Sequence, residues 1–301
     1  MPHGSHALIM KLILTFLFLL STGTSFADAS LQMPLKVFKV GEFDGVRIMV
    51  PCSLESPDGH CFLDTAGSIS IFRNLPPGAE ILGKEQLGGI GWKTDCDKAR
   101  LPSLKMGDME LENFEFMSCP TFEESFAPMI GMNAFWGRRF DIDFAENTLT
   151  WRENPVELSS FSVWAGGPSS RWITMNASFA GSEFTLAWDT GAPVTLVSHT
   201  FVAQFPQYFE PETTRGLPRN MQKSGGKAYR IKKPFVVNGV ELNAEFVQAV
   251  ELKNYFGDVG GMPVILGTNH MRKANWSFDL GMGRAQVSPK AKDGPELPDR
   301  F

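Results

Sequence analysis

The sequence predicts a mostly β protein built from two similar halves, and three observations lead to this prediction. The 301-residue chain is 43% hydrophobic and 20% charged, a composition typical of a globular protein with room for two modest domains. It contains 25 Phe and 29 Gly residues, which favours strands joined by tight turns over helical bundles. A similar series of elements occurs twice along the chain, which indicates internal duplication.

Two short stretches define the repeat. Residues 62–68 (Phe-Leu-Asp-Thr-Ala-Gly-Ser) and 186–192 (Leu-Ala-Trp-Asp-Thr-Gly-Ala) each begin as an apolar strand, reach an Asp-Thr pair and turn on small residues. An aspartate at the end of an apolar run is costly if it is buried alone. We therefore expect Asp64 and Asp189 to meet in one shared carboxylate site.

The elements that follow each stretch also correspond. Each copy continues with a hairpin that alternates in polarity, an apolar-apolar-Gly-x-Asn segment and a closing pair of strands. The hairpin spans 104–116 in the first half and 235–246 in the second. The glycine segment spans 129–135 and 265–271, and the closing strands span 140–151 and 276–287.

This repeat, together with changes in composition, divides the chain into five parts. The segment between the copies is rich in Gly, Pro and Ser, and the end of the chain is polar and rich in Pro. We assign a signal peptide (1–27), an N-terminal lobe (28–152), a linker (153–171), a C-terminal lobe (172–288) and a polar tail (289–301).

The N-terminal segment has the pattern of a secretory signal peptide. Lys11 precedes a short apolar core at 12–20, and small residues lead to an expected cleavage site after Ala27. The apolar core is too short to span a membrane comfortably, so we expect no stable membrane span after cleavage. The sequence thus predicts a periplasmic or secreted protein.

The four cysteines fit export to an oxidising compartment and allow three pairings. Two local symmetries favour one of them. Cys52 and Cys61 flank the turn signal at 56–59, and Cys96 and Cys119 lie symmetrically about Gly107 and its aspartate neighbour. We predict the disulfides Cys52–Cys61 and Cys96–Cys119.

Charge and motif content exclude several functions. The net charge is −5 and there is no strong basic run, which argues against a nucleic-acid partner. The sequence has no Cys-x-x-Cys pair and its five histidines are scattered, so we predict no metal site and no cofactor. Serine-hydrolase, zinc-protease and phosphate-loop motifs are absent as well.

The repeated Asp-Thr turns, each followed by an apolar-apolar-Gly segment, resemble those of the aspartic proteases. The Gly-x-Asn step and the closing Phe-Asp strand are closer to the retropepsin-like, bacterial aspartyl-protease branch than to pepsins. The resemblance covers residues 44–152 and 172–288. It implies two β-barrel-like lobes with a cleft between them, and hydrolysis of peptide bonds in that cleft.

The chemistry of such a site follows from two carboxylates held close together. They cannot both ionise cheaply, so they share a proton and titrate as a pair. The ionised member takes a proton from a water that attacks the peptide carbonyl, and the protonated member donates to the carbonyl oxygen. We expect Asp64 and Asp189 to form this dyad.

The resemblance also implies roles for neighbouring residues. Hydroxyls brace the two catalytic loops, small residues let the backbones approach, and a further hydroxyl bonds the first carboxylate. Two glycines lie beneath the loops, and a glycine-rich hairpin tip is a candidate flap over the substrate, although it also fits a surface loop. The bracing hydroxyls belong to Thr65 and Thr190, the small residues are Gly191 and Ala66, and the further hydroxyl belongs to Ser68. The glycines beneath the loops are Gly131 and Gly267, and the candidate flap contains Gly88, Gly89 and Trp92.

Three positions depart from the family pattern. Ala66 stands where the family has Gly, Pro193 stands where many relatives carry a hydroxyl, and the bulky Trp188 precedes the second aspartate. Both carboxylates are retained, so we expect an aspartic endopeptidase with a polypeptide substrate. The alternative is a catalytically silent relative that binds a peptide or protein partner. Because one chain carries both halves, we expect a monomer.

Overall fold

The computed structural model describes residues 30–41, 43–54, 59–89, 92–122, 128–152, 163–165, 171–212, 225–253, 261–290 and 297–298. Within these ranges the chain is mostly β, and its longest helix has six residues. The expected signal peptide lies outside the described residues, as do the tip of the turn at 56–59 and most of the expected linker and tail.

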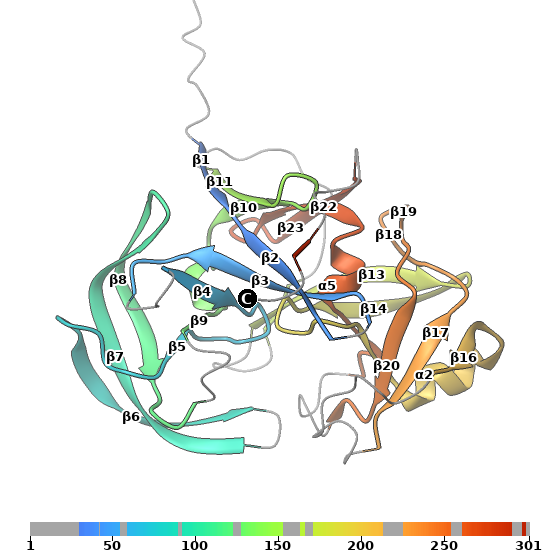
Figure 1. The fold of residues 1–301 in the computed structure, drawn as a ribbon, viewed down its shortest axis with the longest axis horizontal. Helices are drawn as coiled ribbons and strands as arrows, with labels where there is room; N and C mark the ends of the chain where they lie inside the picture. The colour runs from blue at the N-terminus through green and yellow to red at the C-terminus, as the bar shows by residue number, and fades with distance from the viewer. Residues whose placement is uncertain are drawn as a thin grey trace, which may run out of the picture.

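One eight-stranded sheet comes entirely from the first half of the chain and lies on the left in Figure 1. Its strand order is β2-β3-β4-β9-β5-β8-β7-β6. The strands are β2 (Lys36–Val40), β3 (Gly45–Pro51), β4 (His60–Leu63), β5 (Ile71–Phe72), β6 (Glu80–Gly89), β7 (Trp92–Met106), β8 (Met109–Ser118) and β9 (Met129–Ile130). The short 3-10 helix η2 (Met132–Ala134) follows β9.

The hairpin of β7 and β8 forms around the expected turn. Gly107 takes a positive φ of 57°, which glycine adopts without steric cost, and Met106 pairs with Met109 across the turn. The same register continues along both strands and brings Cys96 opposite Cys119. These two cysteines form the expected disulfide, with 4.7 Å between their Cα atoms.

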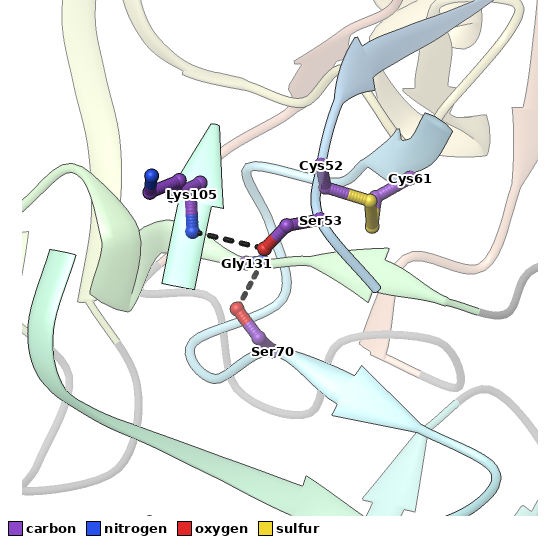
Figure 2. Close-up of a disulfide and its surroundings, with 6 residues drawn as sticks. All are labelled: Cys52, Ser53, Cys61, Ser70, Lys105 and Gly131. Atoms are coloured by element: carbon purple, nitrogen blue, oxygen red, sulfur yellow. Dashed lines mark hydrogen bonds between the residues drawn. A yellow bond between two sulfur atoms is a disulfide. The ribbon is translucent and has the colours of Figure 1, made fainter. Parts of the chain in front are cut away.

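The second disulfide joins the end of β3 to the start of β4, also as expected. Cys52 and Cys61 are bonded with 5.8 Å between Cα atoms, and Cys52 N–H donates to Gly59 O at 3.0 Å. Figure 2 shows this disulfide beside a bond from the Lys105 amide to the Ser53 hydroxyl, at 3.1 Å. The disulfide therefore fixes the hairpin whose second strand, β4, leads directly to the first predicted aspartate.

A ten-stranded sheet comes entirely from the second half of the chain and lies on the right in Figure 1. Its strand order is β16-β17-β20-β15-β21-β14-β13-β18-β19, and β12 pairs with β13. The strands are β12 (Val163–Ala165), β13 (Arg171–Phe179), β14 (Ser182–Trp188), β15 (Leu196–Ser198), β16 (Phe209–Pro211), β17 (Lys227–Ile231), β18 (Phe235–Val237), β19 (Val240–Leu242), β20 (Phe246–Val250) and β21 (Val264–Leu266).

Short helices accompany this second sheet. They are α2 (His199–Gln204), the 3-10 helix η3 (Pro206–Tyr208) and α5 (Thr268–Met271). Residues 163–165, which we expected to be part of a linker, form β12 instead. Val163 and Trp164 are apolar strand formers within the Gly- and Ser-rich segment, which explains why this piece pairs with β13.

A five-stranded sheet joins the two halves of the chain, with the order β1-β11-β10-β22-β23. Its strands are β1 (Ser30–Pro34), β11 (Thr148–Arg152), β10 (Arg139–Asp143), β22 (Ala274–Asp279) and β23 (Arg284–Pro289). We assigned the closing strands to separate lobes, whereas the structure pairs β10 with β22 in one sheet at the top of Figure 1. We also did not expect β1, which covers the free edge of β11.

Aromatic packing holds this shared sheet against the rest of the core. Phe140 on β10 pairs with Phe278 on β22, and their rings stack with centroids 5.0 Å apart. The Phe278 ring also lies 4.7 Å from the ring of Trp188, at the end of β14. All three side chains are fully buried. Burial of these large apolar surfaces stabilises the junction of the two halves.

None of the helices in the described ranges is long and apolar enough to cross a membrane.

We predict that Phe140→Ala lowers the free energy of unfolding by about 3–5 kcal/mol, because it leaves a cavity at the junction of β10 and β22. Urea denaturation measures this change. Leu31→Ala is the matched control, since Leu31 lies in the same sheet but is 40% exposed. The control should change the free energy by about 0.5 kcal/mol or less. Equal effects of the two substitutions would contradict a packed junction.

Candidate active site

The two predicted aspartates occupy equivalent places at the ends of two strands. Asp64 follows β4, which pairs in parallel with β9, and Asp189 follows β14, which pairs in parallel with β21. The backbone amide of Asp64 donates to Ile130 O at 3.0 Å, and that of Asp189 donates to Leu266 O at 3.0 Å. Each aspartate is therefore bonded to the last residue of a strand, β9 or β21, that directly precedes Gly131 or Gly267.

Two threonines bring the aspartate loops together. Thr65 N–H donates to Thr190 Oγ1 at 3.0 Å, and Thr190 N–H donates to Thr65 Oγ1 at 2.9 Å. Each hydroxyl also donates to a carbonyl of the opposite half: Thr190 Oγ1 to Leu63 O at 2.9 Å, and Thr65 Oγ1 to Trp188 O at 3.4 Å. Both threonines are 1% exposed. This exchange is the bracing that the resemblance led us to expect.

Gly191 allows the first carboxyl group to approach the second loop. A Cβ atom on Gly191 would lie 2.6 Å from Asp64 Cγ, closer than real Cβ contacts come, so a side chain has no room there. Ala66, at the matching place in the first loop, has space for its methyl group, which packs against the apolar cluster containing Trp172 and Leu196. The departure from Gly at position 66 is thus accommodated by packing.

The loop amides bind the two carboxylates. Asp64 Oδ1 accepts from the backbone amides of Ala66 and Gly67 at 3.0 and 2.9 Å, and Asp189 Oδ1 accepts from Gly191 at 2.7 Å. The Asp64 carboxyl group also lies against Gly191, whose amide binds Asp189, so the two carboxyl groups are neighbours. Asp189 is only 4% exposed, whereas Asp64 is half-buried. The structure therefore brings the two predicted residues into one carboxyl pair.

The two carboxyl groups differ in their electrostatic environment. Burial raises the pKa of Asp189 well above its ordinary value, and the negative charge of Asp64 raises it further. Burial also raises the pKa of Asp64, but hydrogen bonds from Gly67, Ala66 and the Asp189 side chain oppose this shift. The pair therefore favours a state with one proton and one negative charge.

The structure also accommodates Trp188 and Pro193, the other two departures from the aspartic-protease pattern. Trp188 points into the core, against Phe278, and Pro193 lies against the backbone of Gly45. We expected the Ser68 hydroxyl to bond the first carboxylate. Within the described residues Ser68 is not among the donors to Asp64, which are the loop amides of the first turn.

Gly131 and Gly267 lie directly beneath the loops, as expected. A Cβ atom on Gly131 would lie 2.7 Å from Gly67 O, and one on Gly267 would lie 2.5 Å from Val194 C. Neither position therefore tolerates a side chain without movement of the loop above it.

Two further hydroxyl residues, which we did not expect from the sequence, support the segments beneath the aspartate loops. Ser70 and Thr195 each donate to an asparagine Oδ1 through both amide and hydroxyl, at 2.8–3.2 Å. Each hydroxyl also accepts a backbone amide at 2.9 Å, from Gly131 in the first half (Figure 2) and from Gly267 in the second. Both lie at the same spacing after their aspartate, and this spacing is the signal that could have revealed them.

The same asparagines explain the Gly-x-Asn step in the sequence. Asn133 accepts from Ser70, and Asn269 accepts from Thr195. Asn133 Nδ2 donates to Glu115 O at 2.7 Å, and Asn269 Nδ2 donates to Phe246 O at 2.8 Å. Each asparagine thus ties its aspartate loop to a neighbouring strand of its own sheet.

The candidate flap occupies the tip of the β6–β7 hairpin. Gly88 and Gly89 end β6, Trp92 begins β7, and Gly89 pairs with Trp92 across the hairpin. Residues 90 and 91 lie outside the described residues. In the described ranges there is no group of three or more His, Cys, Asp or Glu side chains that could hold a metal ion.

Comparisons of the chain with models of known protein families and with curated proteins found no match.

We predict a specific pH dependence of stability from the buried Asp189. Because folding raises its pKa above the ordinary 3.8, its contribution to stability is fully present below that pH and is lost as the pH rises through the folded pKa. Asp189→Asn should remove this loss, by about 1.4 kcal/mol for each unit of pKa elevation. Urea denaturation between about pH 3 and pH 8 measures the difference between wild type and variant. A difference that stays constant with pH would contradict the raised pKa.

Proposed function

We propose that this chain is an aspartic endopeptidase that hydrolyses peptide bonds with the Asp64 and Asp189 carboxyl pair. One observation carries the proposal: the Asp64 carboxyl group lies against Gly191, whose amide binds the Asp189 carboxylate, on loops braced by Thr65 and Thr190. Burying two acids side by side costs folding free energy. Such a costly arrangement is typical of sites that perform acid–base chemistry.

The reaction uses one proton and one negative charge. Asp64 accepts two loop amides, which favour its ionised form, while Asp189 is the more deeply buried and holds the proton. Asp64 takes a proton from a bound water as the water oxygen attacks the peptide carbonyl carbon. Asp189 donates its proton to the carbonyl oxygen, which gives a tetrahedral diol intermediate. As the intermediate collapses, Asp64 gives its proton to the amine nitrogen and the C–N bond breaks. Asp189 takes a proton from one diol hydroxyl as the C=O bond re-forms, which restores the starting state of the pair.

A two-lobed organisation with an intervening cleft supplies the framework for this reaction. The repeated pairings of β4 with β9 and of β14 with β21, and the repeated serine or threonine bonds to asparagine, support an origin by internal duplication. In this organisation the substrate lies extended between the lobes and is held partly by backbone hydrogen bonds. The tip at Gly88, Gly89 and Trp92 acts as a flap. One chain supplies both aspartates, so the enzyme works as a monomer.

Export is part of the proposal. The two disulfides fit an oxidising compartment, and residues 1–27 supply the signal peptide. The protein accordingly acts in the periplasm or in the secreted fraction.

A second candidate is a catalytically silent protein that binds a peptide or a protein partner in the same place. Two observations favour it: Ala66 replaces the family's glycine, and backbone amides rather than the Ser68 hydroxyl bind Asp64. These features leave both carboxyl groups beside Gly191, so we place hydrolysis first.

The test is the cleavage of denatured polypeptides from acid to neutral pH. We predict that Asp64→Asn and Asp189→Asn each lower the rate by at least about 100-fold, because each removes one partner in proton transfer. Asp108→Asn is the matched control, since Asp108 lies exposed at the β7–β8 turn. Cleavage that survives both substitutions would refute the mechanism, and a wild-type protein that binds peptides without cutting them would favour the silent binding protein.

A further inference from the structure

The turn between β2 and β3 belongs to the first half of the chain but packs on the second half. Phe43 is 5% exposed and joins an apolar cluster with Val194, Ala228 and Phe246. Its ring lies 5.3 Å from the ring of Phe246. Val194 belongs to the segment that follows Asp189, so this contact reaches the second catalytic loop.

Asp44, the next residue of the turn, forms ion pairs with the second half of the chain. Asp44 carboxylate oxygens lie 3.4 Å from both Arg272 Nη1 and Lys273 Nζ, which follow α5. Asp44 has a positive φ of 56°, which aspartate tolerates better than most residues. These partly exposed ion pairs contribute little energy, but they join the turn to the end of α5 in the second half.

Gly45 brings the turn into direct contact with the loop after Asp189. A Cβ atom on Gly45 would lie 2.6 Å from Pro193 O and 2.9 Å from Pro193 Cβ. Because the backbones touch here, the position of Pro193 is limited on the side that faces the first half. The proline ring itself restricts the backbone further.

Thr268, the first residue of α5, contacts both β3 and Pro193. Its side chain is fully buried, and Oγ1 accepts the Val46 amide at 3.1 Å. The same oxygen lies 2.7 Å from Val46 O and 3.1 Å from Pro193 O, and its single hydrogen is donated to one of them at a time. One hydroxyl therefore joins β3, α5 and the Asp189 loop.

In the described part of the chain, Met132 is the residue on the Asp64 side that corresponds to Thr268. Met132 N–H donates to Gly67 O at 2.7 Å, just as Thr268 N–H donates to Ala192 O at 2.8 Å, so the two residues are equivalent in backbone position. Met132 has no hydroxyl with which to bind a third segment. The hydrogen bonds of the Thr268 hydroxyl to β3 and to Pro193 therefore have no counterpart at Met132.

We propose that Gly45 and Thr268 are positioning residues that hold the Asp189 loop against the first half of the chain and so keep its carboxyl group beside that of Asp64. This inference rests on the proposed function. It assigns this restraint to the Asp189 loop, and it gives Pro193, one of the three departures from the family pattern, a structural role in the same contact.

The test compares Thr268→Val with Thr268→Ser. Valine has nearly the same shape without the hydroxyl, whereas serine retains it. We expect Thr268→Val to lower kcat by about 10- to 100-fold with KM changed by less than about twofold, and Thr268→Ser to retain wild-type values. NMR titration of ¹³C-labelled aspartate should show the pKa of Asp189 moving toward its ordinary value in the valine variant only.

The titration separates this inference from the proposed function, because it needs no turnover. If the wild-type protein cuts nothing, the proposed function fails, but a shifted titration in Thr268→Val still supports the positioning role. Gly45→Ala is a second variant that displaces Pro193 without removing a hydrogen bond. Its control is Gly83→Ala, since a Cβ atom on Gly83 meets nothing within 4 Å.

Two results would overturn the inference. One is a folded Thr268→Val protein whose aspartate titration and kcat match those of wild type. The other is failure of both Thr268→Val and Gly45→Ala to fold while Gly83→Ala folds, because the contact would then serve overall stability rather than the position of the loop.

Discussion

The exchange of hydrogen bonds between Thr65 and Thr190 is the interaction on which the rest of the site depends. Each threonine is buried and bonds both the amide and the hydroxyl of the other, and each hydroxyl also reaches a carbonyl across the junction. The Asp64 carboxyl group occupies the space that a side chain at Gly191 would need. The two carboxyl groups therefore come together only while the threonine bonds hold the loops at this spacing. The buried threonine bonds thus offset the cost of placing two acids together.

Features with local signals could be predicted from the sequence. The register that starts at the Met106–Met109 turn continues to the Cys96–Cys119 disulfide, so symmetry about one turn was sufficient to pair these cysteines. The two Asp-Thr turns likewise predicted that Asp64 and Asp189 meet, and the resemblance to the aspartic proteases implied the bracing by Thr65 and Thr190. By contrast, the pairing of β10 with β22 joins strands more than 130 residues apart, and neither strand carries a signal that names its partner. The strand β1 was missed for the same reason.

The two halves of the site repeat one design but differ in detail. Ser70 and Thr195 form the same hydrogen bonds to asparagine, whereas Thr268, whose hydroxyl contacts Pro193 O, corresponds to the apolar Met132. Asp189 is also the more buried acid. A dyad needs one protonated and one ionised member, and unequal burial provides that difference without any change in the reacting groups.

The central claim is that Asp64 and Asp189 form one carboxyl pair that shares a single proton. Neutron diffraction from crystals of the deuterium-exchanged protein near neutral pH tests it most directly. The claim predicts carboxylate oxygens of the two residues about 3 Å apart or closer, with one deuteron on the pair. Carboxyl groups beyond hydrogen-bonding reach, or two separately ionised carboxylates, would contradict it.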